Sequence, residues 1–506
     1  MRNKFKTFHS VINALGSLLI INGFLLLIPF FTTIIFKEYQ NSNLTVNSFF
    51  LTIIISFALG TISKALFRYS GISKIQAVFI CSLGWIVISL LGSLPFIFIQ
   101  RMALIDAFFE TVSGFTTTGI TMIDNIPSLP RSLLIWRQFI QWVGGLGILT
   151  FFLVVFSRSG EHKIFTAETH KINMKRVVPG MHHSIRILWI IYISFTILIA
   201  LLLFLLDCSI FDSISHALTT LSTGGYSPYD ASIGHYAAIN HPHFKLIEYV
   251  IIFGMFLGGT NFLIHYRLIK GDVKSLWDNL EIRYWLSLIA LFVVLVFLER
   301  LFKANLLEEI SNNPMDIFLI LERNFRKILF QVLAIFTTTG YATQDINSIF
   351  FGHMARQLFL IMMFIGGCVG STSGGFKVMR IAILFKMIKR EVYRFVAPKK
   401  AITYLIIDEK SVERDEIFRI GALFFAWILL LVIGGMVTAF FSEFNGYKSF
   451  SGMFSALGNI GPSFMSVKET IALNPFVKFI YIIGMLAGRL EILPILLLFN
   501  FKAWKY

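Results

Sequence analysis

Charged residues are scarce in this chain. Only 14% of its 506 residues are Asp, Glu, Lys or Arg, whereas 56% are apolar, and the mean hydropathy is +0.75. Soluble domains carry about 25% charged residues, so this composition excludes a protein built from soluble domains. It predicts a polytopic membrane protein whose surroundings are the lipid bilayer.

Cysteine is also rare. The three cysteines, Cys81, Cys208 and Cys368, lie in apolar or membrane-proximal sequence, at spacings that suit neither a disulfide framework nor a zinc site. The His182-His183 pair has no metal-ligand spacing around it. Because no cluster of His, Cys, Asp or Glu converges along the chain, we expect no enzyme activity and no organic cofactor.

Long apolar stretches fill most of the sequence. Each is long enough to cross hydrocarbon about 30 Å thick, and we expect about ten membrane spans. Arg2, Lys4 and Lys6 precede the first stretch, but residues 11–36 are too long for the apolar core of a secretion signal, and no cleavage pattern follows. Residues 11–36 and 49–67 are therefore predicted to be two N-terminal membrane helices.

A short segment rich in Thr, Ser and Gly interrupts the apolar sequence four times. The segments are residues 111–121, 221–227, 336–343 and 457–463. If Gly119, Gly224, Gly340 and Gly461 are equivalent, the gaps between them are about 105 to 121 residues, as expected of one unit repeated four times. A single chain could then surround one central axis.

Each repeat is predicted to contain an apolar helix, a short amphipathic re-entrant helix (residues 105–114 in the first), the Thr/Gly segment and a second apolar helix. The first helices are expected at residues 75–99, 185–206, 282–302 and 417–441, and their partners at 133–156, 244–268, 354–385 and 475–499. The predicted fold class is an all-α polytopic membrane protein with four pseudo-symmetric repeats around one pore. The chain then divides into residues 1–74 for the N-terminal helices and 75–160, 161–270, 271–400 and 401–506 for the repeats.

The Thr/Gly segments are candidates for a selectivity filter. Non-helical backbone at membrane depth is tolerated only where it is buried or lines a water-filled path, and its free carbonyls can replace an ion's hydration shell. Glycine permits the dihedral angles and the close approach that such carbonyls require, and threonine can add hydroxyl oxygens. The candidate filter residues are Thr117, Thr118, Gly119, Ser222, Thr223, Gly224, Thr338, Thr339, Gly340, Asn459, Ile460 and Gly461. One such segment would equally suit an ordinary loop or helix interface, but four copies in the same setting favour a pore.

Basic residues predict the orientation. The Lys and Arg clusters that fall on one side of a ten-span model are the N-terminus, residues 67–74, 158–186, 266–283 and 386–414, and Lys502 with Lys505. That side is the cytoplasm by the positive-inside rule, so both termini are expected there and all four Thr/Gly segments open to the outside. Topology accounts for the net charge of +16, and nucleic acid is not an expected partner.

Four motifs resemble a known family. FETVSGFTTTG at 109–119, TTTGYATQD at 337–345, GGCVGSTSGGFKVMR at 366–380 and GRLEILP at 488–494 are similar to signatures of the Trk/Ktr/HKT superfamily of potassium transporters. The two extra N-terminal helices and the length are most similar to its TrkH branch. The resemblance implies a homodimeric potassium translocation subunit of the bacterial inner membrane, which works with a cytosolic nucleotide-binding regulator of the TrkA kind.

The resemblance also bears on the transported ion, which would bind at the filter residues. In some plant relatives serine replaces the first filter glycine and sodium is carried, but this chain has Gly119, which favours potassium. The fourth segment lacks the threonines, so the pore would be only pseudo-fourfold. A sodium-selective protein, or a sodium- or proton-coupled symporter, stays open as the alternative, although symporters usually carry inverted repeats and midplane acids.

Residues 366–375, here named the glycine-rich loop, contain seven glycines or serines in ten positions and must break a membrane helix. Such a loop suits a flexible plug beneath the filter, or close helix packing through small residues. In the family this region obstructs the pore and moves during gating. The candidate gating residues are Gly366, Gly367, Gly370, Ser371, Thr372, Gly374, Gly375 and Lys377, the last of which could also be a membrane-surface anchor.

Further charges mark the two ends of the expected pathway. Arg489 lies within the last apolar stretch and should face the pore or a structural partner; the resemblance implies an electrostatic barrier below the filter. Asp124, Asp230 and Asp345 follow the first three filter segments and could concentrate cations at an outer mouth. They could equally be ordinary solvated loop acids.

Overall fold

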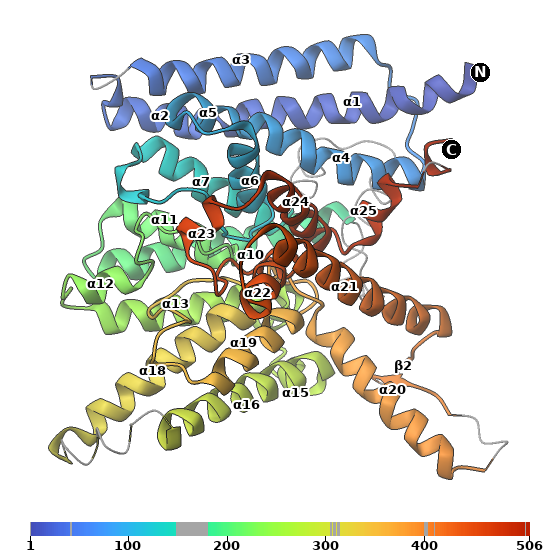
Figure 1. Cartoon of the computed structure of the whole chain (residues 1–506). Helices are drawn as coiled ribbons and strands as arrows, with labels where there is room; N and C mark the ends of the chain where they lie inside the picture. The colour runs from blue at the N-terminus through green and yellow to red at the C-terminus, as the bar shows by residue number, and fades with distance from the viewer. Residues whose placement is uncertain are drawn as a thin grey trace.

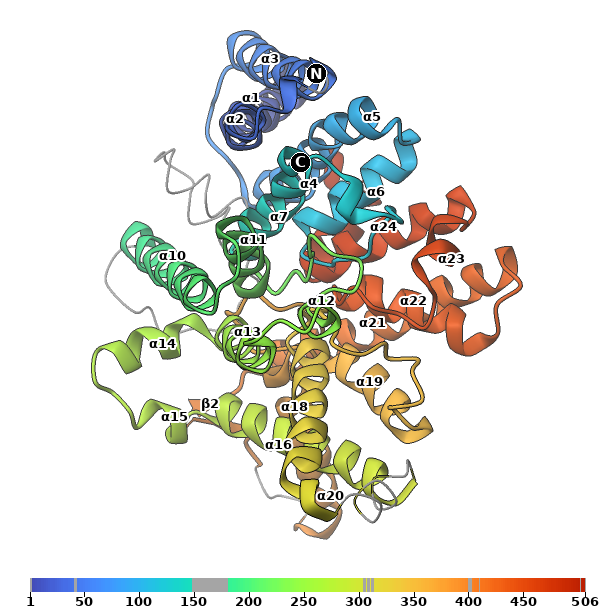
Figure 2. The ribbon, with the colours of Figure 1, turned by 90° about the vertical axis from the view of Figure 1, so that its left-hand side faces the viewer.

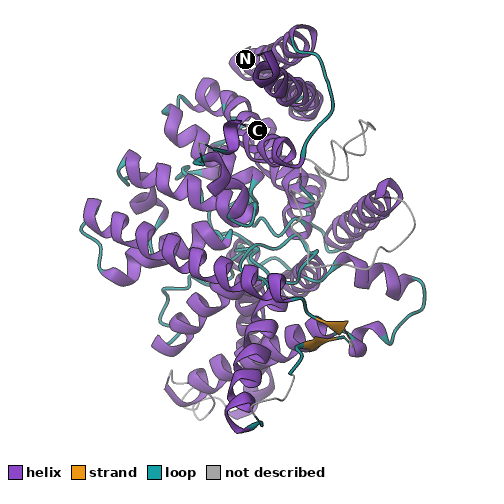
Figure 3. Cartoon of the chain, turned by 90° about the vertical axis from the view of Figure 1, so that its right-hand side faces the viewer, coloured by secondary structure: helices purple, strands orange, loops and turns teal. Residues whose placement is uncertain are grey.

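The structure is a computed structural model that describes residues 2–40, 43–147, 181–303, 306, 310, 314–398, 403–408, 410–500 and 502–505. Most of the predicted basic loop 158–186 therefore lies outside the described residues. The described chain is nearly all helical (Figure 3). Its sheet is a hairpin of two short strands, β1 (Ile406–Ile407) and β2 (Lys410–Ser411). The predicted all-α fold class is confirmed.

Three helices precede the repeats where two membrane helices were predicted, because the first predicted span is divided into two helices. α1 (Arg2–Leu25) continues into α2 (Leu27–Ile35), and α3 (Asn43–Leu66) returns beside α1 (Figure 1). Gly16 and Gly60 let the two backbones approach, since a Cβ atom on either glycine would lie within 3.0 Å of the other's carbonyl oxygen.

The predicted order of elements recurs four times. The first helices are α4 (Lys74–Gly92) with α5 (Leu94–Gln100), α10 (Met181–Leu205), α16 (Leu280–Lys303) and α21 (Arg414–Phe441). The re-entrant helices are α6 (Leu104–Phe115), α11 (Ile210–Leu221), α18 (Ile317–Phe336) and α22 (Gly446–Gly458). The second helices are α7 (Arg131–Gly145), α13 (Phe244–Gly259), α19 (His353–Ile365) and α24 (Pro475–Arg489).

Further elements connect these helices. The α-helical ones are α12 (Gly234–Ala238), α14 (Phe262–Ile269), α15 (Ser275–Asp278), α20 (Val378–Val396), α23 (Val467–Ile471) and α25 (Leu493–Leu498). The 3₁₀ turns are η1 (Glu38–Gln40), η2 (Ile126–Ser128), η3 (Pro314–Asp316) and η4 (Ala503–Lys505).

The described residues contain fewer helices of spanning length than the roughly ten spans expected. Six helices there are long and apolar enough to cross a membrane, and the pair α13 and α14, bent by 103°, would make a seventh. The second helix of each repeat is shorter than predicted: α7 ends at Gly145, α19 at Ile365 and α24 at Arg489. Glycines lie at all four breaks, and glycine weakens a helix because it leaves the backbone free.

The repeats form a closed ring. The second helix of each repeat packs against the re-entrant helix of the next one: α7 on α11, α13 on α18, α19 on α22, and α24 on α6. Figure 2 shows the repeats arranged around a common centre, where the re-entrant helices end. The outward side chains suit lipid, since Phe418, Phe425 and Phe440 of α21 are 75%, 68% and 82% exposed. Both termini lie at the same end of the molecule (Figure 1).

Candidate ion pathway

The four re-entrant helices end in the same backbone conformation. Thr117, Thr223, Thr338 and Asn459 all adopt positive φ angles of 51–58°. Two residues later come four glycines with φ angles of 74–107°: Gly119, Gly225, Gly340 and Gly461. Non-glycine residues seldom adopt the left-handed region, so its recurrence at four matched positions identifies the equivalent residues of the repeats.

The register predicted for the second repeat is wrong by one residue. The sequence suggested Ser222, Thr223 and Gly224, but the structural equivalents of Thr117, Thr118 and Gly119 are Thr223, Gly224 and Gly225. The hydrogen bonds agree, because the N–H groups of Gly224 and Gly225 both donate to the Thr219 carbonyl, at 2.9 and 3.5 Å. In the first repeat, Thr118 and Gly119 donate in the same way to Ser113.

Carbonyl oxygens from the four repeats form a closed ring, here named the carbonyl ring. A Cβ atom on each of the four glycines would fall less than 3.0 Å from a carbonyl oxygen of the next repeat. The pairs are Gly119 with Gly224, Gly225 with Thr339, Gly340 with Ile460, and Gly461 with Thr118. The ring therefore leaves no space for a side chain at any of the four glycines.

Side-chain oxygens lie next to the carbonyl ring. The hydroxyls of Thr116 and Thr118 are 2.7 Å apart, as are those of Thr337 and Thr339. In the fourth repeat Asn459 Nδ2 donates instead to the Thr118 hydroxyl, at 2.9 Å. Backbone and hydroxyl oxygens of this kind can replace the water around a monovalent cation.

The second helix of the first repeat holds the Thr/Gly segment of the second repeat. Gln141 Nε2 donates to the Gly224 carbonyl at 2.6 Å, and Gln141 Oε1 accepts the N–H of Tyr226 at 3.0 Å. The Tyr226 hydroxyl in turn donates to the Glu110 carbonyl at 3.0 Å. These bonds fix the position of the carbonyl ring relative to the helices.

A buried ion pair supports the same region. Arg137 Nε lies 2.8 Å from Glu110 Oε1, and both side chains are fully buried. The second carboxylate oxygen of Glu110 accepts the N–H of Met122 at 2.7 Å. The pair therefore ties α6 and α7 to the chain that leaves the first filter segment.

Breaking this pair should destabilise the protein. We expect Arg137→Leu to lower the free energy of unfolding by about 3–5 kcal/mol, because the Glu110 carboxylate would stay buried without its partner. Thermal unfolding of the purified protein in detergent measures the loss. The matched control is Lys468→Gln, since Lys468 is 78% exposed and 3.9 Å from Asp124, and a surface pair contributes about 0–1 kcal/mol. Equal shifts in the two variants would contradict the expected role of the buried pair.

The glycine-rich loop lies directly against two of the Thr/Gly segments. The N–H of Gly374 donates to the Thr338 hydroxyl at 2.6 Å, and the Thr372 hydroxyl donates to the Leu221 carbonyl at 2.9 Å. The Thr223 hydroxyl donates to the Thr372 hydroxyl at 3.2 Å. The loop thus contacts the ends of the re-entrant helices of the second and third repeats.

Arg489 connects the loop to the first repeat. Its guanidinium donates to the carbonyls of Thr372 at 2.8 Å and of Gly145 at 2.5 Å, and also to Gly144. Arg489 thereby bridges the glycine-rich loop and the broken end of α7. Its neighbour Glu491 pairs with Arg380 at 2.5 Å.

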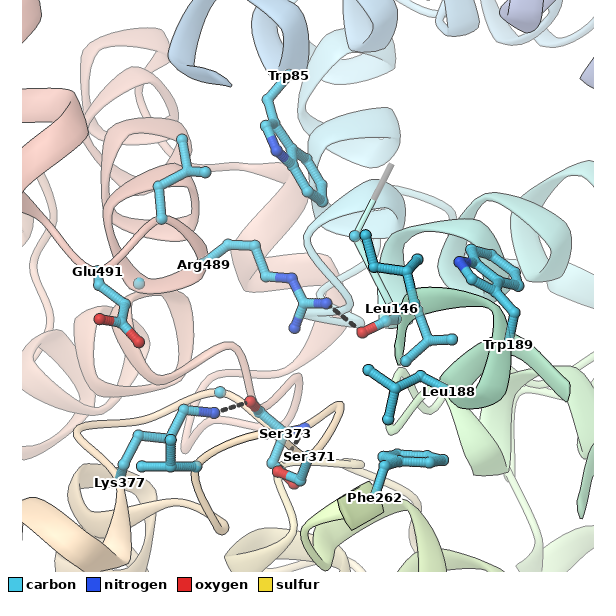
Figure 4. A pocket seen from close by; sticks show the side chains of 18 residues that line it. Trp85, Leu146, Leu188, Trp189, Phe262, Ser371, Ser373, Lys377, Arg489 and Glu491 are labelled. Carbon is cyan, nitrogen blue, oxygen red and sulfur yellow. Dashed lines mark hydrogen bonds between the residues drawn. The ribbon is translucent and has the colours of Figure 1, made fainter. Parts of the chain in front are cut away.

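A cavity of about 110 Å³ adjoins the loop and Arg489 (Figure 4). Trp85, Trp189 and Phe262 form apolar parts of its wall, and Lys377, Arg489 and Glu491 bring charge to it. The Lys377 ammonium donates to the Ser373 carbonyl, so its side chain folds back onto the loop and does not extend to a membrane surface as an anchor would. The loop and Arg489 therefore lie between the carbonyl ring and this cavity.

Comparison with known proteins identifies the family. The model of the TrkH family of cation transport proteins matches residues 45–505. The chain belongs to this family. It is 30% identical to the Trk system potassium uptake protein TrkH of Salmonella typhimurium, over 98% of this chain and 99% of that one. It is also 30% identical to the Trk system potassium uptake protein TrkG of Escherichia coli, over 92% and 93%.

A solved structure agrees with this assignment. The crystal structure of the potassium transporter TrkH from Vibrio parahaemolyticus superposes with a TM-score of 0.83 at 28% identity, covering 98% of this chain and 99% of that one. The family consists of transport proteins, so the prediction that the chain is not an enzyme is confirmed. Within the described residues, no group of three His, Cys, Asp or Glu could hold a metal ion, and the three cysteines are buried and form no disulfide.

The acids predicted at the outer mouth follow their filter segments in this TrkH-family chain and are all exposed. Asp230 Oδ1 accepts the N–H of Ile126 at 2.9 Å, so it joins the loops of the first two repeats. Asp345 accepts the N–H of Asn347 at 2.8 Å, and Asp124 lies near Lys468. Each of the three acids is therefore exposed to solvent and also contacts a nearby residue.

Several residues around the carbonyl ring were not predicted from the sequence. Gly225, Gln141 and the Glu110–Arg137 pair contact or support the carbonyl ring, and none was predicted. One signal was available, because Arg137 and Gln141 are polar residues inside an apolar helix and should face partners. Which partners they face depends on the tertiary fold.

Proposed function

We propose that this chain carries potassium into the cell through the carbonyl ring. The closure of the ring by four glycines is the observation that carries the proposal. Backbone carbonyl oxygens can replace the hydration shell of potassium as it enters. The names of the Salmonella and Escherichia relatives, both potassium uptake proteins, support the choice of ion. Gly119, the position at which serine would favour sodium, supports it too.

The glycine-rich loop and Arg489 form the gate in this proposal. The loop hydrogen-bonds to Thr223, Thr338 and Leu221, and Arg489 adds a positive charge next to it. A hydrogen bond contributes about 1 kcal/mol net to stability. Binding of a partner could therefore break the few hydrogen bonds that hold the loop in place. Movement of the loop would connect the ring with the cavity lined by Lys377.

The membrane orientation follows from the same proposal. The outer side carries Asp124, Asp230 and Asp345, whose exposed carboxylates raise the local concentration of cations. The cytoplasmic side carries both termini, α20 and the 405–412 hairpin. The working unit is a homodimer in the inner membrane, bound to a cytosolic nucleotide-binding regulator of the TrkA kind.

The regulator should bind the basic surface of α20. Lys389 and Arg394 are exposed there, and reversing both charges should weaken binding at least tenfold, because like charges across an interface repel. Affinity of the immobilised TrkA-like regulator for Lys389→Glu/Arg394→Glu measures this effect. Lys468→Glu, on the proposed outer face, is the matched control. Unchanged affinity in the double variant, or an equal loss in the control, would contradict α20 as the docking surface.

Rubidium uptake into liposomes that contain the purified protein tests the proposed function. Sodium, the proton gradient and the membrane potential are varied separately. We expect passive uptake that follows the electrochemical gradient of rubidium and is inhibited by potassium more than by sodium. Uptake that requires a sodium or proton gradient would favour the alternative, a coupled symporter, and equal inhibition by both ions would favour a non-selective or sodium-carrying pore.

A further inference from the structure

A buried carboxylate outside the carbonyl ring also holds the glycine-rich loop, at Val369. Glu281, at the start of α16, is only 2% exposed, and its Oε1 accepts the N–H of Val369 at 2.6 Å. A hydrogen bond from a backbone N–H to a carboxylate is about twice as strong as a neutral one. Lys377, just beyond the loop, is close enough for its charge to act on the same carboxylate.

The start of α16 is tied to the 405–412 hairpin that β1 and β2 form between α20 and α21. Asp408 Oδ1 accepts the N–H of Leu280, the residue before Glu281, at 3.0 Å. A negative charge at this position is also favoured by the helix dipole. The hairpin binds α20 as well, since Lys386 Nζ donates to the Ile406 carbonyl at 2.8 Å. Figure 1 shows β2 beside α20.

The hairpin thus joins the two helices between which the loop is held. α16 binds Val369 through Glu281, and α20 begins at Val378, directly after Lys377. The two helices also pack against each other. A displacement of the hairpin would move Leu280, and with it the carboxylate of Glu281.

We infer that Glu281 is a positioning residue of the gate and that the 405–412 hairpin controls its hold on the loop. The inference rests on the proposed function, in which the glycine-rich loop obstructs the pathway. A force on the hairpin from the cytoplasmic side then loosens Val369 without any contact with the carbonyl ring.

Cys368 provides a reporter that does not depend on ion flux. Its thiol is buried, and it lies directly before Val369. In a full-length chain with Cys81 and Cys208 replaced by alanine, Glu281→Gln should increase the rate of Cys368 labelling by a soluble maleimide about fivefold, because a neutral acceptor holds the N–H less strongly. Asp408→Asn should raise the rate by a smaller factor, since it acts through Leu280.

Asp278→Asn is the matched control, because it removes an exposed carboxylate two residues before Leu280 and should leave labelling unchanged. Rubidium uptake is the second readout. Glu281→Gln should increase uptake about fivefold in the full chain and have no effect once residues 370–374 are deleted, because the residue acts through the loop.

Unchanged Cys368 labelling in folded Glu281→Gln would overturn the inference, as would an equal increase in Asp278→Asn. If Glu281→Gln unfolds, the inference depends on Asp408→Asn, and unchanged labelling in that variant would overturn it. Faster labelling with unchanged uptake would support the hold of Glu281 on the loop but contradict the loop as the gate. The failure of the inference and that of the proposed function are therefore distinguishable.

Discussion

Gly225→Ala should reduce rubidium uptake at least tenfold, whereas Gly224→Ala should reduce it less. Gly225 has a φ angle of 74°, and a Cβ atom there would overlap the Thr339 carbonyl oxygen of the next repeat. Left-handed backbone costs a residue with a side chain about 1–2 kcal/mol, and displacement of a ring carbonyl adds to this. Since about 1.4 kcal/mol corresponds to a tenfold change in an equilibrium constant, we expect a large loss of uptake.

Gly224→Ala is the matched variant because it adds the same methyl group one residue earlier. Its Cβ atom would meet the side chain of Gln141, which can move more easily than backbone. Both variants are compared in liposomes at equal protein content, with potassium and sodium competition measured for each. If Gly224→Ala were the more damaging substitution, the register of the second repeat would be the one first expected from the sequence.

Arg489→Ala should increase rubidium uptake about thirtyfold. At about 8 Å from a potassium ion, in an effective dielectric of about 20, a guanidinium repels the ion by about 2 kcal/mol, which is about thirtyfold in rate when fully expressed. The substitution also removes the hydrogen bonds from Arg489 to Thr372 and Gly145, which hold the loop against α7. Both the loss of repulsion and the loss of these hydrogen bonds should increase uptake.

Arg489→Lys separates charge from hydrogen bonding. Lysine keeps the positive charge but lacks the planar group that reaches several carbonyls at once. If repulsion dominates, uptake in Arg489→Lys stays near that of the unsubstituted chain. Reduced uptake together with a lower unfolding temperature in Arg489→Ala would contradict the barrier and assign Arg489 a structural role.

The order of elements could be predicted from the sequence. Apolar stretches of membrane-spanning length and four Thr/Gly segments at similar intervals indicated the repeats. Both patterns can be recognised from residues that are close in sequence. The breaks in the second helices could not be read in the same way. Paired glycines such as Gly144-Gly145 and Gly258-Gly259 suit close helix packing as well as a helix end, and the tertiary contacts decide between them.

The fine structure of the pathway depends on contacts between distant residues. Gly224 and Gly225 are chemically identical neighbours, and only the folded backbone shows that Gly225 is the one in the left-handed conformation. Glu110 and Arg137 meet only because α6 packs on α7. The contacts of Arg489 with Gly144 and Gly145 span most of the sequence, so its neighbours could not be anticipated.

Anomalous diffraction from crystals grown in rubidium tests the central claim most directly. The claim is that the carbonyls of Thr118, Gly224, Thr339 and Ile460 bind the transported ion. We predict rubidium peaks on the axis between these oxygens, and their loss when rubidium is replaced by sodium. Peaks confined to other parts of the protein, with none between the four carbonyls, would contradict the account.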